Sequence, residues 1–342
     1  MTTDRERFLT RRRARLRQEI GDAGLRLRLE GRVGEALLEE LDYARFPPVH
    51  EGDFPAYGAV LLGPTAPPPE GVGAVVHQAA PGSEQVLRLM ADGRQAFFLR
   101  RAGRSALMVL PTPHDREGEL VRLRAYFGTG RFAAVHRIPG GVVRVFGRSA
   151  LAVWDGGHWW QKPYAGSYAR AVLRAVPGAS PEAAAAILEF CVHTMSPSPA
   201  GATLVWAMEQ ALVDELCAAC RRPIPTISLE DWANHAPLRQ LLAQTDGAAV
   251  LSPAGELMDI GVFLQASAEA FAAIPMEPER GTRHASARRF SFDHGAALVF
   301  VVSQDGPVTV YYRGTVVASI RSRPEDEGHG DGDDTARRRG PP

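Results

Sequence analysis

Two short segments of the chain combine residue types that can bind and transfer phosphate groups. The first is Thr245–Ala248 (TDGA), which leads into the apolar run AAVL, and the second, about 35 residues later, is Gly281–His284 (GTRH). Asp246 comes directly before a predicted buried strand, so we expect its carboxylate at a strand end, where it can hold a metal ion or activate a hydroxyl. Gly247 lets a ligand approach the backbone closely.

The second segment is predicted to open a helix. A helix start offers free N–H groups and a partial positive charge to a phosphate. Arg283 adds a bidentate donor for phosphate oxygens, and His284 adds a proton donor or a metal ligand. Together the segments are compatible with phosphoryl transfer. A plainer alternative stays open, because DGA is a common turn before a strand and Thr282 can simply cap the helix.

The cysteine pair Cys217 and Cys220 is a weaker candidate for chemistry. A zinc site needs four ligands, and Cys191 with His193 is the one nearby pair. A redox pair normally opens a helix after a strand, whereas this pair lies late in a predicted helix. We therefore predict structural cysteines that face a core, and no metal or redox centre.

The segment HWWQKPY at 158–164 gathers aromatic side chains. Such a cluster can hold a flat ligand or a methylated cation. Tryptophans more often anchor cores and interfaces, which is the interpretation we favour here. Ligand sensing by the N-terminal half remains the alternative.

Composition excludes several classes of protein. The 342 residues include 39 Lys+Arg and 39 Asp+Glu, so the formal net charge is zero, and 45% are hydrophobic. We therefore expect packed domains and neither nucleic-acid nor membrane partners. Three cysteines, a charged N-terminus without an apolar stretch, and no apolar run near 18 residues predict a cytoplasmic protein. Lys162 is the single lysine, a bias that we attribute to a GC-rich genome.

The elements that must position these residues fall into two predicted domains. Residues 1–175 form a β-rich α+β domain for sensing or assembly, with short β runs between Gln95 and Trp160 and one helix at 117–127. Before these runs we expect an exposed basic helix at 5–20, a helix at 34–43, and mostly loop from 44 to 84 with one strand at 58–62.

The second domain covers residues 178–323. Ser180 can cap a helix that Pro181 begins, and helices then alternate with apolar strands. This pattern predicts an α/β (α+β) architecture, a mixed central sheet flanked by helices. Residues 324–342 are charged, rich in glycine and nearly free of apolar side chains, so we expect them to be disordered.

Residues 180–323 resemble the diadenylate cyclase (DAC, or DisA_N) domain. The resemblance rests on the strand GATLVWA, the DGA turn, the GTRHxxA helix start, Ser291 and the closing strand ending in VVSQ. The upstream stretch GVVRVFGRSALAVWDGGHWWQKP resembles the end of sensor-like domains that precede some DAC domains. The family implies a nucleotidyltransferase that condenses two ATP into the second messenger cyclic di-3′,5′-AMP plus two pyrophosphates. It also implies Mg²⁺ or Mn²⁺, and a homo-oligomer in which DAC domains face each other.

The resemblance also implies roles for single residues. Asp246 is expected near the ribose 3′-oxygen and the metal, and Thr282, Arg283 and His284 at the phosphates. Asp246, Arg283 and His284 are therefore the expected catalytic residues, with Asp246 and His284 as metal ligands. Gly261 and Leu264 are expected to line the adenine site. The full set of expected nucleotide contacts is Gly247, Ala248, Gly261, Leu264, Gly281, Thr282 and Ser303.

One position departs from the family pattern. The second motif usually reads Arg-His-Arg, and here its third residue is Ala285. Arg288 or Arg289, one turn further along the helix, can reach the phosphates instead; the alternative is that both are solvated. Two alternatives to the cyclase follow: a weak or inactive nucleotide-binding module that senses ATP or cyclic di-AMP, and a related nucleotidyltransferase that makes another cyclic dinucleotide.

Overall fold

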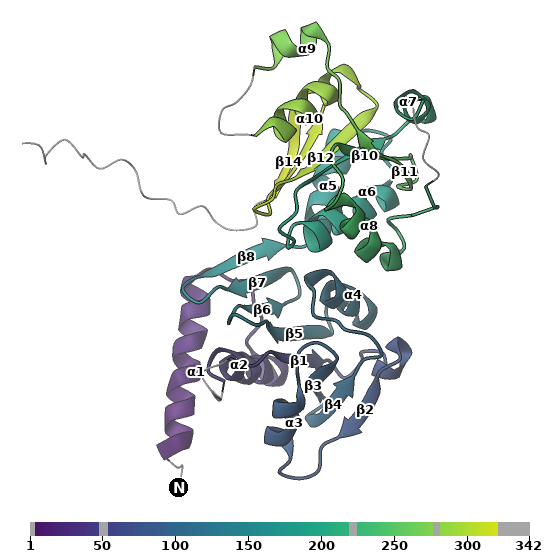
Figure 1. Ribbon diagram of the computed structural model, residues 1–342. Helices are drawn as coiled ribbons and strands as arrows, with labels where there is room; N and C mark the ends of the chain where they lie inside the picture. The colour runs from purple at the N-terminus through teal and green to yellow at the C-terminus, as the bar shows by residue number, and fades with distance from the viewer. Residues whose placement is uncertain (1–3, 48–53, 219–223, 276–280, 321–342) are drawn as a thin grey trace, which may run out of the picture.

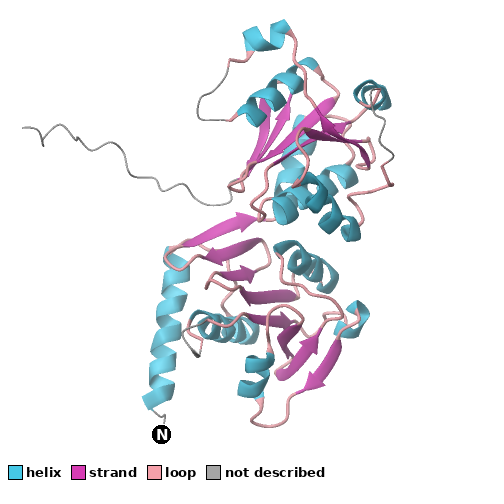
Figure 2. Ribbon diagram, in the orientation of Figure 1, coloured by secondary structure: helices cyan, strands magenta, loops and turns pink. Residues whose placement is uncertain are grey.

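The computed structural model describes residues 4–47, 54–218, 224–275 and 281–320. Within these ranges the chain forms two mixed sheets with helices packed on them, an α+β architecture in two domains, as predicted (Figures 1 and 2). The tail expected to be disordered, 324–342, and Cys220 lie outside the described residues. None of the described helices is long and apolar enough to cross a bilayer.

The N-terminal sheet has eight strands in the order β2-β4-β3-β1-β5-β6-β7-β8. Strands β1 and β3 run parallel, and the other neighbours are antiparallel. All six residues of β1 are buried, because helices cover both faces of the sheet and leave no strand face for water. The strands are β1 (Tyr57–Leu62), β2 (Val75–Gln78), β3 (Ala96–Arg101), β4 (Arg104–Val109), β5 (Phe132–Arg137), β6 (Val143–Phe146), β7 (Ala150–Trp154) and β8 (Trp159–Pro163).

Helices α1 (Asp4–Asp22), α2 (Gly31–Arg45) and α3 (Glu84–Met90) cover one face of this sheet, and α4 (Glu117–Phe127) covers the other. The predictions of β1 and α4 are confirmed. The expectation of mostly loop between 44 and 84 is wrong in part, because this stretch also contains β2 and the short 3₁₀ helix η1 (Pro69–Val72). The four-residue β2 pairs only with β4, so it is an edge strand with little apolar pattern.

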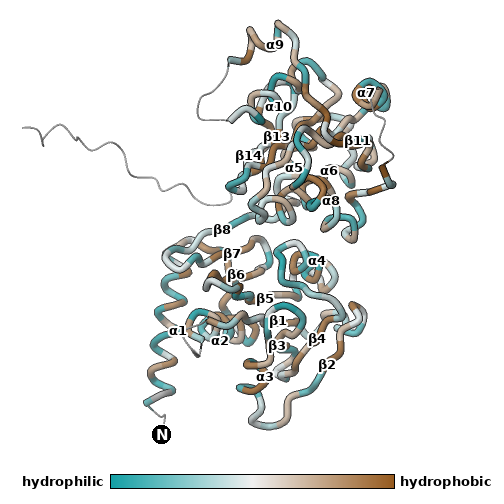
Figure 3. The backbone as a smooth tube through the Cα atoms, in the orientation of Figure 1, coloured by the Kyte–Doolittle hydropathy of each residue, from teal (hydrophilic) through white to brown (hydrophobic). Residues whose placement is uncertain are grey.

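The expectation that the first helix is merely exposed is also wrong in part. Figure 3 shows α1 as largely hydrophilic with short hydrophobic turns, and two of these apolar residues, Leu16 and Ile20, are buried. Its arginines pair with α2: the Arg12 guanidinium lies 2.6 Å from the Asp42 carboxylate. The charges that suggested a solvated helix therefore attach α1 to its own domain.

The aromatic segment at 158–164 forms β8 and its flanks. Trp159 donates a hydrogen bond from Nε1 to Glu19 at 2.9 Å, and the Arg45 guanidinium lies 4.0 Å from the centre of the Trp154 ring. These rings thus attach α1 and α2 to the last strands of the sheet. This packing of Trp159 agrees with the interpretation of the rings as anchors within the domain.

The C-terminal sheet has six strands in the order β11-β10-β9-β12-β13-β14. Strands β9 and β10 run parallel, and the other neighbours are antiparallel. Every residue of β9 and β12 is buried, which explains their continuous apolar sequences. The strands are β9 (Ala202–Ala207), β10 (Ala248–Leu251), β11 (Leu257–Val262), β12 (Ala297–Val302), β13 (Val308–Tyr312) and β14 (Thr315–Ile320).

Helices cover both faces of this sheet as well. As predicted, Ser180 caps α6 by accepting a hydrogen bond from the Ala183 N–H at 3.2 Å. On one face lie α5 (Ala165–Ala175), α6 (Pro181–Glu189), the π-helical turn η2 (Phe190–Met195) and α8 (His235–Leu242). The 3₁₀ turn η3 (Trp232–Asn234) packs beside α8. On the second face lie α7 (Gln210–Leu216) and α10 (Thr282–Asp293), and α9 (Ala268–Ala273) packs on α10.

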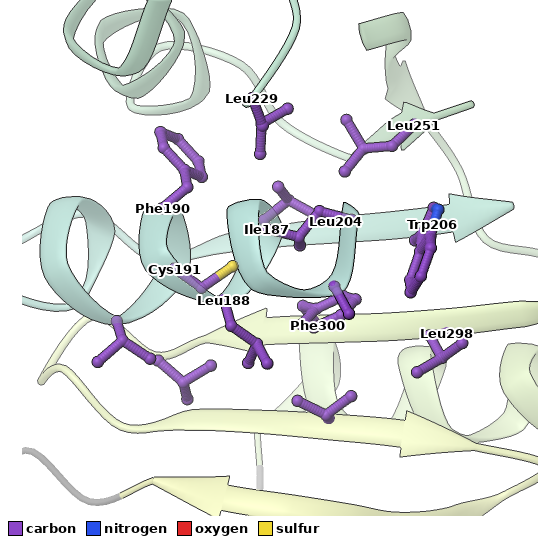
Figure 4. Close-up of a cluster of buried hydrophobic side chains, with 14 of the residues drawn as sticks. Ile187, Leu188, Phe190, Cys191, Leu204, Trp206, Leu229, Leu251, Leu298 and Phe300 are labelled. Atoms are coloured by element: carbon purple, nitrogen blue, oxygen red, sulfur yellow. The ribbon is translucent and has the colours of Figure 1, made fainter. Parts of the chain in front are cut away.

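Helix α5 packs against α6 and β14 in the C-terminal core, although it precedes the expected domain boundary at residue 175. That boundary stays a prediction. Figure 4 shows the side chain of Cys191 in the same core, among Ile187, Leu188 and Phe190. Burial raises the pKa of its thiol, so it stays protonated. Cys217 is half-buried, and no cluster of His, Cys, Asp and Glu suited to a metal occurs in the described ranges.

Candidate functional site

The pairing of β9 with β10 brings Asp246 to the start of β9. The two strands are parallel, and Ala248 lies opposite Thr203. Asp246 and Gly201 each lie two residues before this pair, so both lie at the same end of the sheet. Neighbouring strands are about 4.8 Å apart, which puts the two residues within reach of one ligand.

The pairing of β9 with β12 brings a hydroxyl to the same end. These strands are antiparallel, and Val302 lies opposite Ala202. Ser303 follows Val302 and thus lies on the other side of Gly201 from Asp246. We call these three residues, Gly201, Asp246 and Ser303, the Asp246 edge.

Two glycines shape the DGA turn. Gly247 has φ +90° and Gly261 has φ +76°, a region that residues with side chains rarely adopt. A Cβ on Gly247 would lie 2.7 Å from the carbonyl carbon of Gly261, so the turn and β11 touch backbone to backbone. Asp246 is exposed. Two other expected contacts are less accessible, because Ala248 is buried and Leu264 packs half-buried against the same core.

Helix α10 begins beside this edge, with Gly281 as its N-cap and Thr282 as its first helical residue. Because Gly281 and not Thr282 occupies the N-cap position, the interpretation of Thr282 as the cap is wrong. Glycine has no side chain, so no side-chain hydrogen bond caps this helix. Both residues are exposed. The first N–H groups of a helix have no acceptor within it, so they are available to an anion.

Arg283 reaches the Asp246 edge from the first turn of α10. Its Nη1 occupies the space that a side chain on Gly201 would fill. Sequence reasoning missed the role of Gly201. A glycine directly before the apolar strand ATLVWA was the available signal, because glycine there permits a close approach from outside the sheet.

His284 links the helix to the sheet. Its Nε2 lies 3.0 Å from Ser303 Oγ, and its Nδ1 lies 2.9 Å from the hydroxyl of the fully buried Tyr311. The structure thus brings together two expected site residues, His284 and Ser303. Tyr311 was missed, although a buried tyrosine hydroxyl needs a hydrogen-bond partner and the strand VTVYY offers few.

Neither of the two alternatives for Arg288 and Arg289, a replacement for the arginine missing at Ala285 or a solvated side chain, describes the contacts observed. Arg288 Nε donates to the Gly314 carbonyl at 2.8 Å, and Arg289 Nε donates to the Ile274 carbonyl at 2.9 Å. Gly314 lies in the turn between β13 and β14, at the opposite end of β13 from the Asp246 edge. Both guanidiniums are therefore held by backbone carbonyls away from the first turn of α10.

Comparison with known families agrees with this arrangement. Residues 189–316 match the DAC family, described as "DisA bacterial checkpoint controller nucleotide-binding", and residues 14–163 match DACNK, described as "probable sensor domain DACNK". The chain carries a DAC domain behind a DACNK domain. The DAC match spans the whole Asp246 edge and all of α10.

No curated protein matches the chain. Among solved structures, the crystal structure of a hypothetical membrane-spanning protein from Bacillus cereus is 22% identical, over 46% of this chain and 70% of that one, with a TM-score of 0.31. That likeness carries no argument about the fold.

The DAC domain offers one carboxylate that suits a divalent metal. Mg²⁺ prefers oxygen ligands and is often held by one or two carboxylates together with substrate phosphates. The exposed Asp246 fits this arrangement. His284 has both ring nitrogens at hydroxyls, so it can bind a metal only after Ser303 or Tyr311 moves away.

Proposed function

We propose that the DAC domain is a diadenylate cyclase, which condenses two ATP into cyclic di-3′,5′-AMP and two pyrophosphates. One observation carries the proposal: a carboxylate, a guanidinium, a hydroxyl and a helix start converge on the Asp246 edge of a domain whose family is described as nucleotide-binding. Such a set can bind a triphosphate and activate a ribose hydroxyl.

Each step of the proposed reaction is an in-line displacement. The 3′-oxygen of one ATP bonds to the α-phosphorus of the other, the bond from that phosphorus to the bridging oxygen breaks, and pyrophosphate leaves with the electron pair. Asp246 lies at the sheet end where it can accept the proton of the 3′-hydroxyl. A second displacement closes the ring. Bound Mg²⁺ or Mn²⁺, held by Asp246 and phosphate oxygens, would neutralise phosphate charge.

The remaining residues bind and orient the triphosphate. Arg283 and the backbone N–H groups at Gly281 and Thr282 donate to phosphate oxygens and stabilise charge in the transition state. His284 holds the hydroxyl of Ser303 at 3.0 Å, which fixes the direction in which it meets the triphosphate.

Ring closure requires two nucleotides that attack each other. Two DAC domains that face each other across a two-fold axis would each bring one ATP, so we propose a homo-oligomer as the active form. The rate should then rise more steeply than linearly with protein concentration below the dissociation constant. A strictly linear dependence at all dilutions, with a monomer by light scattering, would contradict the facing arrangement.

The test is mass spectrometry of the products after the full chain is incubated with ATP and Mn²⁺ or Mg²⁺. The expected product has the mass and retention time of the 3′,5′-linked standard, and Asp246→Asn should abolish it. Asp214→Asn, a change at an exposed carboxylate on α7, is the matched control and should keep full activity. A different mass from mixed nucleotides would identify another cyclic dinucleotide.

A second candidate is a nucleotide-binding module without turnover. It is favoured by Ala285, because Arg288 and Arg289 both bind carbonyls elsewhere. Loss of one such donor can reduce a rate by about 10²–10³. This candidate predicts that ATP or cyclic di-AMP raises the melting temperature while no product forms with either metal.

A further inference from the structure

A cavity with several charged side chains in its wall lies between the two domains. Its wall includes Pro199, two residues before Gly201, but none of the three residues of the Asp246 edge. It has a volume of about 320 Å³ and is bounded by the start of α4 from the DACNK domain and by η2, η3 and α8 from the DAC domain. Figure 1 shows α4 facing α8 across this junction. The packing is close beside it, because a Cβ on Gly118 of α4 would lie 3.2 Å from the His193 carbonyl oxygen of η2.

Four arginines from both domains line this cavity: Arg116, Arg122 and Arg144 from the DACNK domain, and Arg239 from the DAC domain. None of them forms an ion pair with a residue that the structure describes. Nε of Arg239 is buried and has no hydrogen-bond partner in the same part of the chain. Burial, and next the charge of Arg116, lower the pKa of Arg239, while the charge of Glu119 opposes them, so Arg239 lies close to a like charge.

Two of the three acidic residues at the cavity are paired with cations other than these arginines. Asp115 lies 3.3 Å from the Arg94 guanidinium, and Glu117 is paired with Lys162 at 2.8 Å. Glu119 accepts the Arg116 backbone N–H at 3.0 Å and is the one of the three whose charge offsets the arginines without another cation beside it. Four guanidiniums against this carboxylate give the cavity an excess of positive charge. The N-termini of α4 and α8, which both begin at its wall, add to this field.

The cavity also has an aromatic wall. Trp232 of η3 is half-buried and stacks on His235, with the ring centres 4.6 Å apart. The volume lies at the lower end of the range for ligand pockets, so the ligand must be small. Guanidiniums arranged around one space recognise phosphate in particular.

We propose that this cavity binds a small phosphate-bearing molecule at the junction of the DACNK and DAC domains. The phosphate is held by Arg116 and Arg239, and the body of the molecule lies against Trp232. Because the two arginines belong to different domains, the ligand favours the docked arrangement over any in which the domains part. It thereby favours one orientation of the DAC domain relative to the DACNK domain.

The test is titration of the full chain with ribose 5-phosphate and, separately, with inorganic phosphate, followed by calorimetry and by tryptophan fluorescence. We expect saturable binding of ribose 5-phosphate. Inorganic phosphate should bind more weakly, because it lacks the sugar that fills the cavity. Arg116→Gln and Arg239→Gln should each weaken binding about tenfold or more, because each removes a charge-assisted contact. Arg122→Gln, a change at an exposed position of the cavity wall, should also weaken binding while the chain stays folded.

Two controls separate this cavity from the Asp246 edge. Arg170→Gln changes an exposed arginine on α5 and should leave binding unchanged. Arg283→Gln should also leave ribose 5-phosphate binding unchanged, whereas it should weaken ATP binding. No saturable binding of the ester, binding unaffected by the Arg116 and Arg239 variants, or loss of binding with Arg283→Gln would each overturn the proposal.

Discussion

At the scale of single residues, Arg283 can reach the Asp246 edge because Gly201 has no side chain there. Its guanidinium occupies the space beside Gly201, and Asp246 lies two residues before the neighbouring strand β10, at the same sheet end. His284, next in the helix, spans from Tyr311 in the core to Ser303 at the edge. The positions of Arg283 and His284 therefore depend on residues from other segments of the chain, at the start of β9, the end of β12 and in β13.

Gly201→Ala tests the position of Arg283. The new Cβ displaces the flexible end of that side chain, and it also lies 3.1 Å from the Val302 carbonyl oxygen, so we expect a loss of stability of about 1 kcal/mol. Formation of cyclic di-AMP should fall by about 10²-fold, because one phosphate contact is lost. Gly166→Ala, where a Cβ meets nothing within 4 Å, is the control. Full activity of Gly201→Ala would contradict the role of Arg283.

Tyr311→Phe tests whether His284 is positioned from the core. The change removes the hydroxyl 2.9 Å from Nδ1, a hydrogen bond worth about 1 kcal/mol. We expect kcat for cyclic di-AMP formation to fall about fivefold while KM for ATP stays unchanged. Tyr312→Phe on the next residue should leave both constants unchanged. An equal effect of the two substitutions would indicate a general loss of packing instead.

At the scale of elements, the sequence predicted what local patterns encode. The buried strands β9, β10 and β12 follow from continuous apolar runs, and α6 follows from its Ser-Pro start. Strand β14 was missed because four of its six residues are exposed or half-buried, so its apolar pattern is weak. The π-helical turn η2 continues the apolar sequence pattern of α6 without a break. The change from α-helical to π-helical hydrogen bonding can therefore be seen in the structure but not in the sequence.

In the candidate site, too, the sequence indicates local motifs but not the contacts made by tertiary packing. Asp246, Arg283 and His284 stand in motifs that can be found in the sequence, and the structure brings their segments to one sheet end. The directions of Arg288 and Arg289 depend on carbonyls at Gly314 and Ile274, and these are close only after the sheet and α9 have formed. Side-chain direction on the far turns of a helix is thus set by tertiary packing.

The strand β5 carries a histidine that should make stability depend on pH. His136 is buried beside Arg144, and burial first, then that charge, lower its pKa to about 3 from the ordinary 6.5. The unfolded chain binds one more proton below pH 6.5, so stability should fall as the pH drops from 6.5 towards 3, by about 1.4 kcal/mol per unit. In urea unfolding between pH 6.5 and 5, His136→Gln should flatten this slope. An unchanged slope would show that other groups set it.

At the scale of the whole molecule, a buried polar contact joins the domains. Lys162 Nζ lies 2.8 Å from Glu117 Oε1 within the DACNK domain and 2.6 Å from the Val192 carbonyl of the DAC domain. His193 Nδ1 lies 2.7 Å from the same carboxylate, and its Nε2 accepts the Ala165 N–H at 3.3 Å. Lys162, the single lysine of the chain, therefore forms a buried contact between the two domains. The scarcity of lysine alone gave no indication of this role.

Glu117→Gln should weaken the junction of the two domains. The substitution leaves the Lys162 ammonium buried without its counter-charge, which costs about 3–5 kcal/mol of stability. Burial alone would raise the pKa of Glu117, but Lys162 and then His193 outweigh it and hold the value at about 2, below the ordinary 4.5. This contribution is therefore present above pH 4.5 and is lost as the pH falls towards 2.

Urea unfolding of the full chain at pH 7 and between pH 4.5 and 2.5 measures both effects. Glu117→Gln should be less stable at pH 7 and should lack this part of the acid-dependent loss. Glu117→Gln with Lys162→Met removes both charges and should recover part of the stability, because no unpaired ammonium remains. If the single variant were as stable as the parent chain, the ion pair would not hold the domains together. If the double variant were no better than the single one, the loss would arise from packing and not from an uncompensated charge.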